Sequence, residues 1–210
     1  MKFIIQLLFF IIFCSSLVLS QTDSLNVEQN PSQHKYEVMA FGGGSLPYLP
    51  VFFKDNWKSA WSVGIGYGIS YTPGDLGYVT LYQTIDHSQL KYKQAVSNDQ
   101  NLFNHGNIYI TNIMVNLKGN FTLKIIPVEP YFFLGIGAMD YISSGINVED
   151  HGNTVIKDRQ KLIFAWTFGV GLEVPITKRI GVFVEGKSNI GVIEPTKQIF
   201  PLHGGVHLRF

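Results

Sequence analysis

A strict alternation of large and small residues between positions 61 and 71 constrains the fold of this chain more than any other feature. Every odd position of the segment is large and apolar or aromatic: Trp61, Val63, Ile65, Tyr67, Ile69 and Tyr71. Every position between them is small: Ser62, Gly64, Gly66, Gly68 and Ser70. Side chains two residues apart share a face in a β-strand but not in a helix. The segment is therefore predicted to be a strand with one bulky face and one small face.

The same pattern recurs along the chain and predicts eight strands. Five further segments show it clearly, namely 109–118, 131–139, 164–174, 180–188 and 205–210. Two are less regular. In 35–43, Tyr36, Val38 and Ala40 are set against Glu37, Met39 and Phe41, whereas the pattern of 78–87 does not indicate which face points inward.

The connections between these strands alternate in length. Three are short or moderate (72–77, 119–127 and 175–179), and four are longer and polar (44–58, 88–106, 141–160 and 189–197). With both termini on one side, all the shorter turns fall on that side and the longer loops on the other. This asymmetry is typical of outer-membrane barrels, which pair short periplasmic turns with longer external loops.

Residues 1–20 resemble a cleaved secretory signal peptide. Lys2 precedes an apolar run over 3–13, and the small Ser20 marks the expected cleavage site. An uncleaved anchor is the alternative, and Cys14 as a lipoprotein cysteine is disfavoured by the bulky Phe13 before it. We expect a flexible periplasmic lead-in over 21–34 and a single barrel domain over 35–210.

Composition narrows the class of protein further. The chain of 210 residues is 46% hydrophobic and only 15% charged, which excludes a disordered chain. Its net charge of +1 provides no basic field for nucleic acid. The mean hydropathy is +0.14, yet no stretch past residue 20 approaches the ~18 apolar residues of a spanning helix. Such a chain is either a soluble β protein or a barrel that meets lipid.

The pairing of large with small faces favours lipid on the outside. A narrow eight-stranded barrel has little room inside, so the glycine-bearing face must point inward and the bulky face outward. Outward Trp and Ile would form an exposed apolar patch in water but suit a bilayer. Four aromatic residues are predicted to form interfacial girdles: Trp61, Tyr71, Tyr109 and Trp166. A soluble secreted barrel or sandwich remains an alternative.

The repeated Gly-x-Gly strands (64–68, 135–138 and 169–174) and the C-terminal strand ending at Phe210 resemble the OmpA/OmpX-like small outer-membrane β-barrels over about residues 35–210. The resemblance implies an eight-stranded antiparallel up-and-down barrel in a Gram-negative outer membrane. It also implies that Val206, Leu208 and Phe210 are read by the barrel-assembly machinery. It fixes no activity, because the family includes adhesins, anchors and small pores.

Six charged residues are predicted to face the lumen: Glu37, Lys118, Glu173, Glu185, Lys187 and Arg209. Three are acidic and three basic, so we expect a mutually neutralising network, with four of them near the turn end, since buried charge is tolerated only when paired. The alternative is that the turn-end residues are simply solvated.

No motif indicates catalysis, a cofactor or a metal site. The six histidines are scattered, and His203 and His207 are four strand residues apart, roughly 13 Å. Adjacent His87 and Ser88 point to opposite faces and form no dyad. The chain is therefore expected not to be an enzyme.

Two kinds of function remain. The first is a structural or surface-interaction barrel that acts through the external loops 88–106 and 141–160, whose partner the sequence does not identify. The second is a passive channel for small or apolar solutes, as in OmpW-like barrels. A packed lumen would favour the first, and an open one the second.

Overall fold

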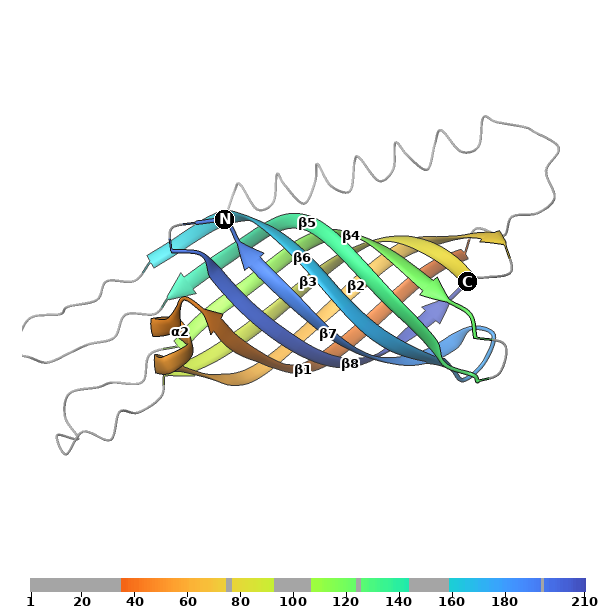
Figure 1. The fold of residues 1–210 in the computed structure, drawn as a ribbon, viewed down its shortest axis with the longest axis horizontal. Helices are drawn as coiled ribbons and strands as arrows, with labels where there is room; N and C mark the ends of the chain where they lie inside the picture. The colour runs from red at the N-terminus through yellow and green to blue at the C-terminus, as the bar shows by residue number, and fades with distance from the viewer. Residues whose placement is uncertain (1–34, 75–76, 93–106, 124–125, 144–158, 194) are drawn as a thin grey trace, which may run out of the picture. The chain divides into compact units, whose positions relative to one another are not determined.

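The computed structural model describes residues 35–74, 77–92, 107–123, 126–143, 159–193 and 195–210. It is a closed barrel in which each strand pairs with the next along the chain and β1 pairs with β8 (Figure 1). All eight pairings are antiparallel. The strands are β1 (Lys35–Leu49), β2 (Trp57–Gly74), β3 (Gly77–Tyr92), β4 (Asn107–Phe121), β5 (Glu129–Ser143), β6 (Arg159–Pro175), β7 (Ile180–Gly191) and β8 (Lys197–Arg209).

The predicted eight-stranded antiparallel barrel is thus confirmed, and its closure rules out the sandwich alternative. The strands are longer than the alternation predicts. Most of 44–58, expected to be a polar loop, is instead the end of β1, the short helix α2 (Val51–Asn56) and the start of β2. Much of 189–197 likewise belongs to β7 and β8. Pairing continues there because each strand end finds a hydrogen-bonding neighbour, which hydrophobic periodicity alone does not reveal.

The barrel has two different ends. The chain enters β1 and leaves β8 at the end that also carries the turns β2–β3, β4–β5 and β6–β7; we call this the turn end. The other end, which we call the loop end, carries the connections 50–56, 93–106, 144–158 and 192–196. The predicted segments 1–20 and 21–34 lie outside the described residues. Among the residues that are described, no helix is long and apolar enough to cross a membrane.

The inward and outward faces follow the predicted alternation. On β2, Val63 and Ile65 are exposed, whereas Ser62 points to the barrel axis and is fully buried. The less regular β1 follows the expected pattern, with Tyr36 and Val38 outside and Glu37 inside. In β3, whose facing the sequence left open, the even-numbered residues from Thr80 to Leu90 point inward.

A β-bulge reverses the facing of β2 near its start. The register between β2 and β3 shifts by one residue between Ser59 and Ser62. An extra residue in one strand inverts the inside–outside alternation beyond it. As a result, Trp57 is buried inside the barrel with 4% of its surface exposed, whereas Trp61 lies outside with 43% exposed.

Candidate functional site

The lumen at the turn end holds a cluster of four charged side chains: Glu37, Lys118, Glu173 and Arg209. Glu37 and Arg209 face each other across the β1–β8 closure, and the Arg209 Nε donates to Glu37 Oε1 at 2.9 Å. The Lys118 ammonium lies 3.6 Å from Glu37 and 3.5 Å from Glu173. Arg209 also contacts Glu173. Two acids and two bases therefore neutralise each other.

Two hydroxyl groups form hydrogen bonds with the charged side chains of this turn-end cluster. Ser70 donates to Glu37 at 2.6 Å. The Tyr78 hydroxyl lies 3.0 Å from a carboxylate oxygen of Glu173 and 3.0 Å from one of Glu129, and it accepts from Arg209. A buried carboxylate is tolerated when counter-charges and hydrogen bonds satisfy its lone pairs. Most of the carboxylate oxygens meet that condition, whereas Glu37 Oε2 accepts no hydrogen bond and has the Lys118 ammonium 3.6 Å away.

Aromatic residues form the next layer of the lumen. Six inward side chains pack together there: Met39, Phe41, Tyr82, Tyr131, Phe133 and Phe183. The Lys118 ammonium lies 5.1 Å from the centre of the Tyr131 ring, and Lys187 lies 5.0 Å from that of Phe41. Both distances suit cation–π attraction. The aromatic layer therefore touches the turn-end cluster on one side and a second charged cluster on the other.

This mid-barrel cluster consists of Asp86, Glu185, Lys187 and His203. The Lys187 ammonium spans the lumen from β7 to β3 and donates to Asp86 at 2.9 Å. It also lies 3.9 Å from Glu185. Hydrogen bonds from Asn112 to Asp86 (2.8 Å) and from Tyr131 to Glu185 (3.1 Å) complete it.

A chain of hydroxyl groups leads from this cluster toward the loop end. His203 Nε2 lies 2.8 Å from Ser62 Oγ and its Nδ1 lies 3.6 Å from Glu185. Ser62 in turn pairs with Ser88, and Ser88 with Ser45, each at 2.8 Å. The order Ser–His–Glu matches that of a nucleophile, base and acid. Ser62 is fully buried and His203 is 1% exposed, so no substrate can reach the hydroxyl, and the arrangement supports packing rather than catalysis.

Apolar side chains close the lumen at the loop end. This loop-end plug comprises Trp57, Leu90, Ile108, Ile110, Met114, Met139, Ala165 and Ile199, all at most 4% exposed. Buried polar side chains lie among these residues, since Ser88, Asn112 and Asn189 stand opposite Ile110, Met139 and Ile199 in the strand register. From the turn end, the lumen thus passes from charged to aromatic to charged side chains, and ends in a mixture of large apolar and uncharged polar side chains.

The six predicted lumen charges all point inward but occupy two places. Glu37, Lys118, Glu173 and Arg209 meet at the turn end, whereas Glu185 and Lys187 lie in the mid-barrel cluster. Sequence reasoning missed Asp86, because the facing of 78–87 was unassigned. It also missed Ser62 and His203 as partners, since no sequence signal relates β2 to β8 across the barrel.

The predicted girdle residues lie on the outer surface at different heights. Trp61 and Tyr109 both pack against His87 near the loop end, with ring centres 5.4 and 5.8 Å from its ring. Tyr71 lies near the turn end of β2, and Trp166 lies at the middle of β6, stacked on Phe168. Membership of a girdle stays a prediction for these residues.

The C-terminal residues singled out in the sequence lie outside. Val206 and Leu208 are exposed on β8, and Phe210 follows the strand with its amide donating to Tyr36 O at 2.9 Å.

Most of the loops 88–106 and 141–160 falls outside the described residues. Among those described, no group of three or more His, Cys, Asp or Glu side chains is arranged to hold a metal ion.

No protein-family model and no curated protein matches the chain. Several solved structures are similar to the chain in fold. Neisserial surface protein A has 15% identity over 84% of this chain and 97% of its own, with a TM-score of 0.49. The N-terminal barrel of Pseudomonas aeruginosa OprF has 17% identity over 85% and 100%, with a TM-score of 0.46. A major outer-membrane protein of Thermus thermophilus has 12% identity over 85% and 100%, with a TM-score of 0.49. Identities this low concern the fold alone.

Proposed function

We propose that this chain is an integral barrel of a bacterial outer membrane, with a closed lumen and a structural or surface-interaction role carried by its external loops. The observation that carries the proposal is the combination of an apolar outer face with a lumen that buried side chains occupy along the described strands.

The outer face supports a lipid environment. Large apolar side chains are exposed on all eight strands, among them Ile65 (63%), Val170 (65%) and Leu202 (61%). Contiguous exposure of this kind is rare on soluble monomers, since each such side chain costs about 1.5–3 kcal/mol if it is left in water. Closure also leaves no strand edge with unpaired backbone groups, which hydrocarbon requires.

The packed interior supports an anchoring or interaction role over a passive channel. The loop-end plug places Leu90, Ile110 and Met139 at the axis with none of their surface exposed. At the other end, the turn-end cluster fills the lumen with paired charges. Buried side chains therefore occupy the lumen at both ends, which favours the first role over a channel.

A barrel placed in the outer membrane would contact three kinds of partner. The outer face would contact membrane lipid, and the exposed Val206, Leu208 and Phe210 would be available to the barrel-assembly machinery. A surface partner would meet the connections at the loop end, and no nucleic acid, cofactor or catalysis is part of the proposal.

The test is expression of the full chain in a Gram-negative host, followed by membrane fractionation and gel electrophoresis with and without boiling. We expect the protein in the outer-membrane fraction and a change of migration on boiling, because a folded barrel resists the detergent. A soluble periplasmic protein whose migration is unaffected by boiling would contradict the proposal. In planar bilayers, steady unit conductance would contradict the closed lumen and favour the channel.

A further inference from the structure

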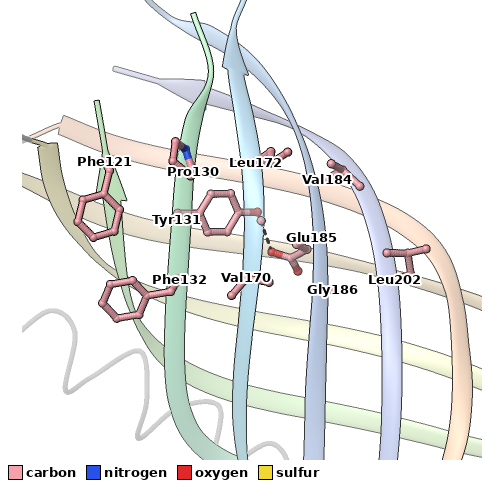
Figure 2. A pocket seen from close by; sticks show the side chains of 11 residues that line it. Phe121, Pro130, Tyr131, Phe132, Val170, Leu172, Val184, Glu185, Gly186 and Leu202 are labelled. Carbon is pink, nitrogen blue, oxygen red and sulfur yellow. Dashed lines mark hydrogen bonds between the residues drawn. The ribbon is translucent and has the colours of Figure 1, made fainter. Parts of the chain in front are cut away.

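The outer wall of the barrel carries an apolar groove on the half nearest the turn end. Its volume is about 460 Å³, and Figure 2 shows the side chains that line it. The strand register orders them in two rows. One row pairs Pro130 with Leu172 and Leu172 with Val184. The other pairs Phe132 with Val170, Val170 with Gly186, and Gly186 with Leu202.

The depth of the groove comes from Gly186. This glycine faces outward between Val170 and Leu202, two side chains that are among the most exposed on the wall. A Cβ added there would meet nothing nearer than a Leu202 methyl at 3.9 Å. The missing side chain therefore leaves open space between Val170 and Leu202.

Packed aromatic side chains form the border and the floor of the groove. Phe121 and Phe132 pack with ring centres 6.0 Å apart at its border. Beneath it, Tyr131 occupies the space that a side chain at Gly171 would need, with its Cζ 2.3 Å from an added Cβ. The Tyr131 hydroxyl is fixed by its hydrogen bond to Glu185. A fixed shape lets an apolar ligand keep its van der Waals contacts.

Two basic side chains lie at the turn end of the same strands. Lys178 and Arg179 are exposed in the turn between β6 and β7, which is ordered by hydrogen bonds from the amides of Arg179 and Ile180 to the Thr177 hydroxyl. Leu172 is three residues from the end of β6, roughly 10 Å along the strand. Half of a bilayer's hydrocarbon is ~15 Å thick, so the turn lies at the level of lipid phosphates when the groove lies among acyl chains.

We propose that the groove binds a phospholipid of the leaflet at the turn end, with one acyl chain along the Gly186 gap and the phosphate beside Lys178 and Arg179. The apolar lining fits the chain, and the two cations fit the phosphate. The site rests on the proposed function, since it needs the barrel to span a bilayer. It differs from general lipid contact because a single position, Gly186, controls it.

The test compares lipid retention by native mass spectrometry after the barrel has been extracted in mild detergent from phospholipid vesicles. The variants are Gly186→Leu, which fills the groove, and Gly42→Leu, a matched control at an outward glycine of β1 that does not line the groove and has no atom nearer than 3.6 Å to an added Cβ. Val184→Trp fills the groove from the next row, and a Lys178→Gln/Arg179→Gln double variant changes only exposed residues.

We expect wild type and Gly42→Leu to retain a phospholipid, and both groove-filling variants to retain it about tenfold more weakly. The double glutamine variant should lose about fivefold per charge. Equal retention by Gly186→Leu, Val184→Trp and Gly42→Leu would overturn the site while leaving the proposed function intact, provided all change migration on boiling. A wild-type chain that does not insert into vesicles would overturn both.

Discussion

Glu37 and Arg209 stand opposite each other on the first and last strands, and the Arg209 Nε donates to Glu37 Oε1 at 2.9 Å. This contact joins residues at the two ends of the barrel sequence. Because Lys118 and Glu173 complete the cluster, closure of the sheet and neutralisation of the buried charge depend on the same side chains.

Replacing Arg209 by Gln should destabilise the barrel markedly. It leaves Glu37 and Glu173 buried with Lys118 as their one permanently charged partner, beside the His207 ring 3.5 Å from Glu173. Breaking a buried pair from one side costs about 3–5 kcal/mol. The free energy of unfolding in urea, measured with the barrel in vesicles, checks this. Lys58→Gln, at an exposed position of β2, is the control. Equal unfolding midpoints for the two variants would show that the turn-end residues are merely solvated.

The pair formed by Asp86 and Lys187 should show strong coupling. Lys187→Met alone strands the fully buried Asp86 carboxylate and should cost about 3–5 kcal/mol. Adding Asp86→Asn should recover part of that loss, because the stranded charge is then gone. A double-mutant cycle on the free energy of unfolding measures the coupling. Strictly additive effects would mean that the 2.9 Å contact is energetically unimportant.

An inward glycine should tolerate a methyl group far less well than an outward one. At Gly169 an added Cβ would lie 2.5 Å from the Phe133 ring and 2.8 Å from the backbone oxygen of Gly186. Gly169→Ala should therefore cost about 1–3 kcal/mol through overpacking. Gly204→Ala is the matched outward variant, with its nearest atom at 3.8 Å, and should be close to neutral. Similar losses for both would contradict the assigned faces.

The loop-end plug should block ions. Wild-type protein in planar bilayers should show no steady unit conductance, since Trp57 and its apolar neighbours fill the axis. Trp57→Ala should lower the free energy of unfolding by about 3–5 kcal/mol, as expected for deletion of a buried aromatic side chain. A wild-type channel with constant conductance would contradict the closed lumen directly.

The sequence predicts the barrel because inside and outside alternate residue by residue. The Gly and Ser positions of 62–70 leave only one face that fits a narrow interior, so the pattern alone assigns Val63 and Ile65 to the outside. The inward and outward faces of 78–87 could not be predicted in this way, because polar and apolar residues occur on both faces of β3. Its inward set includes Thr80, Tyr82 and Asp86, and its outward set includes Gln83 and His87.

Trp57 and the mid-barrel cluster could not be predicted for physical reasons. The bulge between Ser59 and Ser62 inverts the alternation, so periodicity extended from Trp61 would place Trp57 outside. The contact of Lys187 with Asp86 crosses the lumen between β7 and β3, which are not neighbours in the sheet. Periodicity assigns faces, but the pairing of side chains across the lumen depends on the stagger of the closed barrel.

The three tryptophans of the chain test the central claim most directly, because the structure places them on opposite sides of the wall. Trp61 and Trp166 are 43% and 40% exposed on the outer face, whereas Trp57 is 4% exposed inside. Three single-tryptophan variants, with the other two positions changed to Phe, would be folded into vesicles of brominated phospholipid, which quenches tryptophan fluorescence on contact. We expect strong quenching of Trp61 and Trp166 and little quenching of Trp57. If Trp61 and Trp166 are instead quenched by aqueous iodide and not by the lipid, the outer face meets water and the membrane barrel is wrong.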